Sequence, residues 1–379
     1  ANCFAQRISG KVVDAASGQP LAFVTITVPG SNVGAYSDID GKFEWPTEAQ
    51  TLRFTYLGYE DQTVQDLHQT MLVKLIPSTY NLNEAVILPG VNPAHRIINQ
   101  AIANKDQHHP EKSFAYTCET YNKFIFTLDP SAIDSITLQR DTSMQEVMKF
   151  IDSQHIMMME SVTEKKFKPP ASSEEKIIAN RFSGFKNPQF ALLASQLQSF
   201  SLYDELLTVG DADYLSPLCN GATRKYLFIL EDTVAVAPDT VFTISFRPRT
   251  GKNFDALKGT LFINTNGYAI QQVIAEPATM DPNLNIKIQQ QYAFVDQIRW
   301  FPVQLNSFLS FPMLDAEGLD LVGIGKTYLQ KIELESELKR REFDGVVLKI
   351  DPLAGRQDSS LWDKARVDAL SDKELKTYH

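Results

Sequence analysis

Apolar and polar residues alternate in short stretches through residues 7–77, and turn-forming residues separate the stretches. In one stretch Ala22, Val24, Ile26 and Val28 alternate with Phe23, Thr25 and Thr27. A period of two is that of a β-strand. The separating segments are rich in Asp, Gly and Pro, and Asp40-Gly41 in particular is a strong hairpin signal. Several short strands at this spacing predict a small β-sandwich over residues 7–77.

A helix is predicted directly after a linker at residues 78–91. Asn92 is suited to the N-cap and Pro93 to the first helical turn. The helix is expected to end near residues 106–110, and its apolar face consists of Ile97, Ile98, Ala101 and Ile102. Asn187-Pro188 predicts the start of a second helix, with Phe190, Leu193, Ala194 and Leu197 on one side.

Strand patterns dominate the rest of residues 92–350. Residues 116–126 form one long aromatic-rich run, and residues 242–246, 284–294 and 301–310 alternate between apolar and polar. Asn266-Gly267 marks a turn between two of the strands. These patterns predict an antiparallel meander with one dry and one wet face.

The predicted fold class is therefore mainly β: an N-terminal β-sandwich followed by a larger α+β region at residues 92–350, built on an antiparallel sheet with packed helices. Two polar segments, residues 128–145 and 166–176, are expected to be loops, the second of them mobile. Residues 351–379 are predicted to form a helical tail.

Both ends of the chain carry a signal of their own. Residues 1–6 resemble the end of a secretory signal peptide, although a lipidated Cys3 or an ordinary tail is also compatible with them. Ser371-Asp372-Lys373-Glu374 is typical of a capping box. A helix starting there is too short to be stable alone, so we expect the natural protein to continue past residue 379.

Composition narrows the functional classes. The 379 residues carry a formal net charge of −10, which argues against a general nucleic-acid binder. No apolar run approaches the roughly 18 residues of a membrane-spanning helix. Three cysteines are present, with no C-x-x-C pair. A disulfide between Cys118 and Cys219 and two separate buried thiols are both compatible with the spacing.

Four motifs in the first region resemble the carboxypeptidase-regulatory-like domain. They are Gly10-Lys11-Val12-Val13-Asp14, Gly18-Gln19-Pro20-Leu21, Ser37-Asp38-Ile39-Asp40-Gly41-Lys42-Phe43 and Tyr56-Leu57-Gly58-Tyr59. The resemblance implies a transthyretin-like sandwich that is not itself a peptidase. Such domains are common at the N-termini of outer-membrane receptors.

The larger region resembles a family of unknown function found in outer-membrane proteins of Gram-negative bacteria. The resemblance is carried by Asn92-Pro93-Ala94-His95-Arg96-Ile97-Ile98, Tyr121-Asn122-Lys123-Phe124, Gly184-Phe185-Lys186-Asn187-Pro188 and Lys252-Asn253-Phe254-Asp255. In that family a C-terminal membrane β-barrel follows, so the resemblance implies that this chain stops before one. Residues 240–310 are also similar to periplasmic lipoprotein carriers, which shelter acyl chains in an open half-barrel.

No motif for catalysis or a cofactor stands out. His108-His109-Pro110-Glu111 has the H-x-x-E spacing of two zinc ligands but lacks a supporting third ligand. Asp38-Ile39-Asp40-Gly41 resembles part of a calcium loop, yet a tight turn explains it better. Ser173–Lys176 matches S-x-x-K in a predicted loop. We therefore predict no catalytic residue, no metal site and no cofactor.

Two surfaces remain as candidate binding sites. Arg247, Arg249, Lys252 and Lys258 form the densest basic cluster, which could contact phosphate-bearing head groups or simply be a solvated loop. The aromatic residues Phe242, Phe246, Phe262, Tyr292 and Phe294 could line a half-barrel cavity or fill an ordinary core. Met157-Met158-Met159 is expected to fill a core.

Three functional hypotheses follow. The first is a non-enzymatic periplasmic module of an outer-membrane-associated protein in envelope transport or assembly. Its partners would be lipid, another envelope protein, or the outer membrane reached through the absent barrel, but not nucleic acid. The second is a carrier that binds a lipid or an acyl chain in a half-barrel cavity. The third, a hydrolase, has no supporting constellation of residues.

Overall fold

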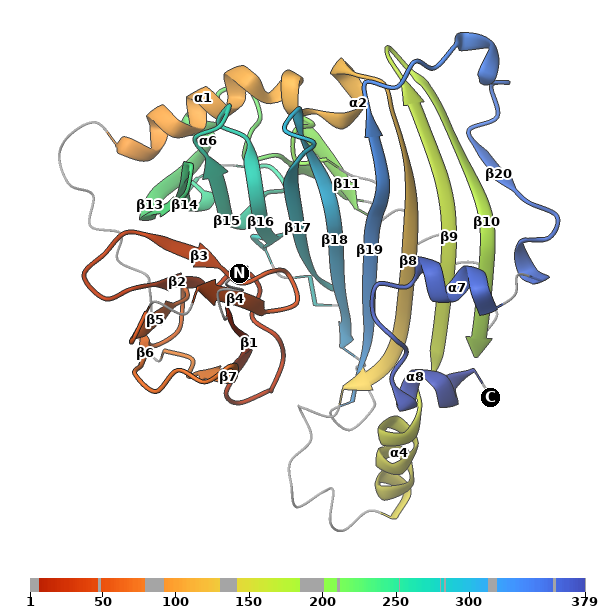
Figure 1. Cartoon of the computed structure of the whole chain (residues 1–379), viewed down its shortest axis with the longest axis horizontal. Coiled ribbons are helices and arrows are strands. Elements are labelled where there is room, and N and C mark those ends of the chain that lie inside the picture. Colours follow the sequence, from red (N-terminus) through yellow and green to blue (C-terminus); the bar gives the residue numbers. More distant parts are fainter. Residues whose placement is uncertain are drawn as a thin grey trace, which may run out of the picture. The chain divides into compact units, whose positions relative to one another are not determined.

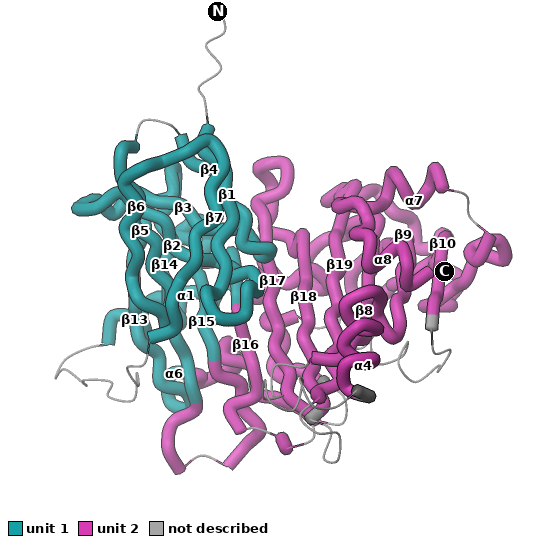
Figure 2. The backbone as a smooth tube through the Cα atoms, turned by 90° about the horizontal axis from the view of Figure 1, so that it is seen from below, with its two compact units in different colours: residues 1–104, 223–247, 259–273 teal, residues 105–222, 248–258, 274–379 magenta. Residues whose placement is uncertain are grey.

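The computed structural model describes residues 7–46, 49–78, 92–129, 142–184, 201–209, 212–251, 253–279, 281–282, 284–312, 319–356 and 359–378. The chain divides into two compact units (Figure 2). The first comprises residues 1–104, 223–247 and 259–273, and the second residues 105–222, 248–258 and 274–379. A compact unit in this protein is therefore not a continuous stretch of sequence.

Seven short strands of the first unit form the predicted β-sandwich (Figure 1). One sheet has the order β4 (Lys42–Pro46), β1 (Arg7–Asp14), β7 (Thr70–Leu75). The other has the order β3 (Gly34–Tyr36), β2 (Thr25–Thr27), β5 (Leu52–Thr55), β6 (Gln62–Val64). The buried core between them is made of Ile8, Val12, Leu21, Val24, Ile26, Phe43, Trp45, Leu52, Phe54, Val73 and Leu75. The sandwich prediction is confirmed.

The Asp40-Gly41 turn is present, but it does not close a hairpin within one sheet. The Asp38 carboxylate accepts hydrogen bonds from the backbone N–H groups of Asp40 and Lys42, at 2.9 and 2.7 Å. Gly41 has φ of +75°, and a Cβ there would lie 2.6 Å from the Val12 carbonyl oxygen. The strands on either side pair elsewhere, β3 with β2 and β4 with β1. The turn thus leads the chain from one sheet to the other.

Helix α1 (Pro93–His108) begins where the sequence predicts it. The Asn92 side chain accepts a hydrogen bond from the Ala94 backbone N–H at 2.9 Å, which is the predicted N-cap. Ile97, Ile98 and Ala101 of its apolar face are buried, and Ile102 is half-buried.

Further strands of the first unit follow α6 (Ala222–Lys225). They are β13 (Tyr226–Val236), β14 (Asp239–Pro248) and β15 (Leu257–Asn264), which neighbour one another in that order. The Asn266-Gly267 turn leads to β16 (Ile270–Pro277), within which the chain passes into the second unit. The Asn264 N–H donates to the Ala269 carbonyl at 2.9 Å across this turn, as the sequence predicts.

The second unit is built on a sheet that joins strands far apart in sequence. Its order is β17 (Asn285–Val295), β18 (Arg299–Pro312), β19 (Asp320–Leu334), β8 (Tyr116–Asp129), β9 (Met157–Lys168), β10 (Ser172–Gly184), β20 (Leu348–Ile350). From β17 to β10 the pairs are antiparallel, and β20 lies parallel to β10. The mainly β fold class and the antiparallel sheet are confirmed.

The predicted loop at residues 166–176 is wrong. This segment is the tip of the β9–β10 hairpin, and both strands continue to within a few residues of Pro169-Pro170. Opposite charges face one another across the hairpin: Lys166 Nζ lies 2.9 Å from Glu174 Oε1, and Lys165 Nζ lies 3.1 Å from Glu175 Oε1. Cross-strand ion pairs let a polar segment form a strand.

Short elements complete the described residues. They are α2 (Pro110–Ser113), α4 (Thr142–Ser153), β11 (Leu206–Val209), β12 (Ala212–Leu215), the 3-10 turns η1 (Arg340–Glu342) and η2 (Ala354–Arg356), α7 (Ser359–Ala365) and α8 (Asp372–Thr377). Helix α4 begins inside the predicted loop 128–145, because Met144 and Ile151 bury an apolar face. The second predicted helix, after Asn187-Pro188, lies outside the described residues.

Residues 351–379 hold two short helices, α7 and α8, and α8 begins with the predicted capping box. The Ser371 hydroxyl accepts from the Glu374 backbone N–H at 3.2 Å, and the Ser371 N–H donates to Glu374 Oε2 at 2.7 Å. Among the described helices, none combines the length and the apolar character needed to cross a bilayer.

Candidate functional site

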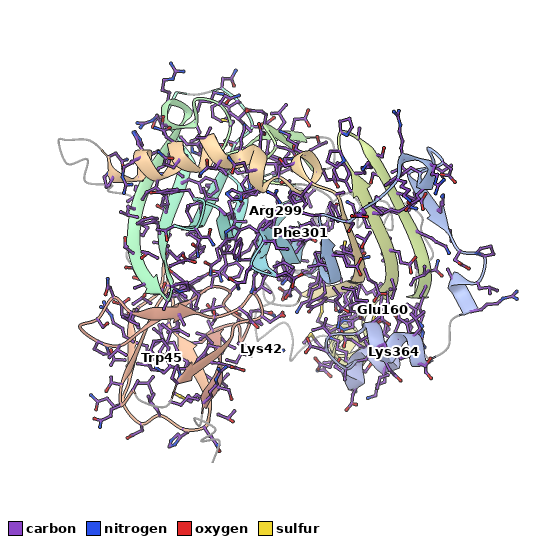
Figure 3. The ribbon with its side chains drawn as sticks, turned by 45° about the horizontal axis from the view of Figure 1, so that its top comes forward. Lys42, Trp45, Glu160, Arg299, Phe301 and Lys364 are labelled. Atoms are coloured by element: carbon purple, nitrogen blue, oxygen red, sulfur yellow. The ribbon has the colours of Figure 1, made fainter. Side chains whose placement is uncertain are left out.

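A group of hydrogen-bonded, largely buried polar side chains lies where α7 and α8 meet the sheet of the second unit. We call this group the carboxylate cluster; it consists of Tyr121, Lys123, Glu160, Arg366, Glu374 and Tyr378. Tyr121 and Lys123 are two residues apart on β8, and Lys123 is the register partner of Glu160 on β9, so all three side chains share one face. Figure 3 shows Glu160 on this sheet, with Lys364 on α7 nearby.

Glu160 is fully buried, and four donors saturate its carboxylate. The guanidinium of Arg366 donates from Nε to Oε1 and from Nη2 to Oε2, both at 2.7 Å. The hydroxyl of Tyr121 donates to Oε1 at 2.6 Å, and that of Tyr378 donates to Oε2 at 2.7 Å. Charge-assisted bonds of this bidentate form are among the strongest that side chains make.

These bonds fix the protonation of the cluster. Burial alone would raise the pKa of Glu160, but the hydrogen bonds from Arg366, Tyr121 and Tyr378 outweigh it and lower the pKa. Burial and the Glu160 charge raise the pKa of both tyrosines. The cluster therefore stays charged and hydrogen-bonded at neutral pH, which suits an anchor and not a general acid or base.

A second ion pair joins α8 to β8. Lys123 Nζ lies 2.6 Å from Glu374 Oε1, and both side chains are largely buried. The Arg181 guanidinium lies 3.7 Å from the centre of the Tyr378 ring, a cation–π contact. Apolar packing surrounds the charges, because Trp362 and Ala365 of α7 pack against Tyr121, Val162, Ala179 and Tyr328. The cluster holds α7 and α8 on the sheet.

The opposite face of the sheet carries a buried core cluster, which we call the apolar floor: Phe124, Phe126, Met157, Met159, Ile286, Ile288 and Leu309. Gly323 and Gly325 on β19 are the register partners of Phe126 and Phe124. A Cβ at Gly325 would lie 3.0 Å from the Phe124 ring and 2.5 Å from Ser307 Oγ. The glycines thus leave room for the two rings.

The predicted aromatic lining does not gather on one face of the strands. Phe242 and Phe246 share a face of β14, but Phe262 is the register partner of Thr243 and so lies on the other face. The Phe262 ring contacts those of Phe23 and Tyr36, at 5.7 and 5.3 Å between ring centres.

The other two predicted lining residues belong to β17. The Tyr292 ring lies 6.1 Å from that of Tyr203, and Phe294 lies 5.7 Å from Trp300. Phe246, Phe262 and Tyr292 are buried, whereas Phe242 and Phe294 are half-buried. These positions do not test whether the side chains bind a ligand, so the ligand cavity stays a prediction.

The predicted basic cluster is likewise divided. Arg247 is exposed at the end of β14, and Arg249 follows it in the next turn. Lys258 forms an ion pair with Glu276 at 3.2 Å, and Lys252 lies outside the described residues. Head-group binding by these residues stays a prediction.

The H-x-x-E segment has structural partners. His109 is buried: its Nδ1 accepts from the Glu111 backbone N–H at 3.0 Å, so Nε2 carries the proton and donates to Asp204 at 2.9 Å. Glu111 lies 2.7 Å from Lys165 Nζ. Within the described residues no group of three or more His, Cys, Asp or Glu side chains could hold a metal ion.

The remaining motif residues also have structural positions. Ser173–Lys176 lies in β10, where Glu174 pairs with Lys166 and Lys349, and Lys176 pairs with Asp351 at 2.9 Å. Cys118 and Cys219 are both buried free thiols, so the disulfide alternative is wrong. Met157, Met158 and Met159 are buried in β9, as expected of core residues.

Sequence reasoning missed the carboxylate cluster. Its residues come from β8, β9, α8 and the segment after α7. The sequence indicated the strand at residues 116–126 and the helix after Ser371, but not that they meet. A buried Glu in a run such as Met157–Val162 is a local signal, because an apolar strand face rarely carries a carboxylate without a partner.

The folds define a β-sandwich module joined to a larger antiparallel-sheet region. Residues 8–87 match the CarboxypepD_reg-like domain, and residues 97–320, more than half of the chain, match the family of unknown function DUF5686. The chain belongs to the DUF5686 family. No curated protein matches it.

Solved structures give only loose likenesses. A DUF1329 family protein from Desulfovibrio piger shares 10% identity at a TM-score of 0.29, and the alignment covers 67% of this chain and 98% of that one. A LolA superfamily protein from Nitrosomonas europaea shares 10% identity at a TM-score of 0.28, with the same coverage. Superpositions at these scores carry no argument about function.

Proposed function

We propose that this chain is a non-enzymatic module of an outer-membrane-associated protein, placed on the periplasmic side, that binds other envelope components in transport or assembly. One observation carries the proposal: the buried polar side chains of the second unit serve as fixed anchors. Glu160, Lys123 and His109 each join two elements through an ion pair or hydrogen bond.

This use of charge differs from that in an active site. A catalytic acid or base needs a pKa near the working pH and access to a substrate proton. Glu160 has a lowered pKa and four donors around its two oxygens, and the Cys118 thiol is buried with its pKa raised to about 12. The resemblance of nearly the whole sequence to outer-membrane proteins supports the envelope location.

Protease accessibility tests the location. In the cells that produce the protein, we expect it to fractionate with the outer membrane. Protease added to intact cells should leave the sandwich intact, and protease added after outer-membrane permeabilisation should cleave it. Recovery of the protein in the cytosolic fraction would contradict the proposal.

One observation favours a second candidate function, the binding of an acyl chain against the apolar floor. Ser307 is the register partner of Gly325, is buried, and its hydroxyl has no hydrogen-bond partner within the described part of the chain. A buried polar group without a partner calls for a water molecule or a ligand. A lipid with its polar end at Ser307 and its chain along Phe124 and Met159 would satisfy the hydroxyl.

Native mass spectrometry tests this second function. An acyl-chain carrier should show a lipid adduct after gentle purification, and Ser307→Ala should weaken binding of a fluorescent fatty acid about fivefold, the effect of one hydrogen bond near 1 kcal/mol. Ser310→Ala on the same strand is the matched control, because Ser310 lies on the other face and already donates to Asp320. Equal binding by both variants, or no adduct, would exclude a carrier role for this site.

A further inference from the structure

Strand β20 and the residues beside it expose an unusual run of aliphatic side chains. Val346, Val347, Leu348, Ile350 and Leu353 are 50%, 60%, 55%, 62% and 59% exposed. Clustered aliphatic exposure on a soluble surface marks an interaction site more often than chance does.

The backbone of β20 has a free side. Among the described strands, β20 stands at the end of the strand order and pairs with β10 alone (Figure 1). The Val347 carbonyl accepts from the Glu175 N–H at 2.7 Å, and the Asp351 N–H donates to the Ile177 carbonyl at 2.9 Å. Backbone N–H and C=O groups alternate in direction along a strand. The groups of the odd-numbered residues therefore point to β10, and the groups of Leu348 and Ile350 point away from the sheet.

The charges that would normally protect such an edge are engaged within the molecule. Edge strands avoid pairing with other chains by presenting lysines and other charges. Lys349 Nζ instead lies 2.5 Å from Glu174 Oε2 and 2.8 Å from Asp344 Oδ2. Asp351 Oδ2 lies 2.9 Å from Lys176 Nζ. Leu348 and Ile350 therefore combine aliphatic side chains with outward backbone donors and acceptors, whereas the Val346 N–H already donates to Asp344 Oδ1 at 3.0 Å.

We infer that β20 pairs with β20 of a second copy of this chain. An antiparallel pair centred on Leu348 places Leu348 opposite Leu348, and Val346 opposite Ile350 on both sides. All these positions are aliphatic, so no charge faces another, and the outward backbone groups of Leu348 form the mutual hydrogen bonds of an antiparallel pair. A single twofold axis relates the two copies, so the outward hydrogen-bonding groups of both strands are paired at once, as a closed dimer requires.

The partner is a protein strand and not a lipid surface. A lipid surface would satisfy the aliphatic side chains but not the outward N–H and C=O groups, which need donors and acceptors. The self-complementary register is what selects a copy of the same chain.

Sedimentation velocity tests the inference. The full chain should show a monomer–dimer equilibrium in the micromolar range, and Leu348→Lys should raise the dimer dissociation constant at least about tenfold, because two like charges then meet at the axis. Leu72→Lys is the matched control: Leu72 is 60% exposed on β7 of the sandwich, and its substitution should leave the equilibrium unchanged. Because both sites are exposed, circular dichroism should show both variants folded.

Thiol cross-linking tests the register. The Cα atoms of a hydrogen-bonded antiparallel pair lie about 5.5 Å apart, so Leu348→Cys should join to itself through a short bifunctional thiol reagent. Val346→Cys and Ile350→Cys should cross-link efficiently only when the two proteins are mixed. A monomer at every concentration, a dimer that Leu348→Lys leaves intact, or binding of neutral phospholipid vesicles by the monomer through this strip would each overturn the inference.

Discussion

The sandwich core and the carboxylate cluster hold their elements together by opposite means. In the sandwich, two sheets meet through aliphatic and aromatic side chains such as Leu52 and Phe54, both fully buried. In the cluster, α7 and α8 meet the sheet through Glu160, Arg366 and a Lys123–Glu374 pair. Apolar burial is non-directional, whereas a buried carboxylate requires each of its donors in place.

This difference teaches how each region should fail. A core that loses one side chain loses its burial and leaves a cavity, in proportion to the atoms removed. A buried ion pair that loses one partner leaves an uncompensated charge, which costs more than the pair contributed. A single substitution should therefore destabilise the carboxylate cluster more than the sandwich core, although fewer residues form the cluster.

The largest effect is expected from Arg366→Ala. Removing the guanidinium leaves the buried Glu160 carboxylate with only the two tyrosine hydroxyls, a loss of about 3–5 kcal/mol for a broken buried pair. Hydrogen–deuterium exchange of residues 359–378 would show α7 and α8 released from the sheet. The exposed Arg356 of η2 provides the control, since Arg356→Ala should leave exchange unchanged. Equal exchange in the two variants would show that the cluster does not anchor the helices.

Leu52→Ala should cost about 2–5 kcal/mol, the range for a buried leucine that leaves a cavity. Leu52 is fully buried in β5, whereas Leu72 of β7 in the same sandwich is 60% exposed. Leu72→Ala should therefore change stability by less than about 0.5 kcal/mol. Urea unfolding of each variant in a Trp300→Phe, Trp362→Phe background, followed by the fluorescence of Trp45, would compare the two. A smaller loss for Leu52→Ala than for Leu72→Ala would refute the core assignment.

The sandwich could be predicted from sequence because its information is local. Alternation sets each strand, and Asp, Gly and Pro mark the turns. The same holds for the Asn92 cap and the Ser371 capping box, each of which needs only neighbours within a few residues. What the local pattern could not provide was pairing: the turn at Asp40-Gly41 is present, but β3 and β4 belong to different sheets.

The carboxylate cluster could not be predicted because its residues are far apart in the sequence. The β9–β10 hairpin could not be predicted because its ion pairs lie across two strands. Glu160 and Arg366 are 206 residues apart, and no periodicity relates them. The polar run Ser172–Lys176 has no apolar alternation, and its strand depends on Lys165 and Lys166 across the hairpin. Phe262 of β15 has the right residue type for a cavity wall, but the register places it on the sheet face opposite to Phe242 and Phe246.

Acid should loosen α8 before it affects the sandwich. Burial, helped by Lys373, lowers the pKa of His155 to about 4, below the ordinary 6.5. Between these values the unfolded state binds more protons, so the stability of this region falls as the pH drops from about 6.5 towards 4. Below about 4.5, Glu160 and Glu374 add to the loss, because their lowered pKa values stabilise the fold only while they are ionised.

Amide hydrogen exchange of residues 371–378, measured at a series of pH values, reports this loosening. The His155 backbone N–H donates to Thr377 Oγ1 at 2.9 Å, so the histidine lies directly against α8. His155→Asn should remove the loss of exchange protection between pH 6.5 and 4 and should keep the loss below pH 4.5. His68→Asn, at an exposed position of the sandwich, is the control and should leave both parts in place.

The smallest effect is expected from Ser371→Ala, which removes only the cap of α8. The hydroxyl accepts from the Glu374 N–H at 3.2 Å, and the loss of such a cap costs about 0.5–2 kcal/mol. Glu374 would keep its ion pair with Lys123, so α8 should fray at its start without leaving the sheet. Ser371→Thr retains the hydroxyl and should restore most of the exchange protection. If Ser371→Ala released α8 as fully as Arg366→Ala, the cap and not the buried charge would be the main anchor, and the contrast between the two regions would not hold.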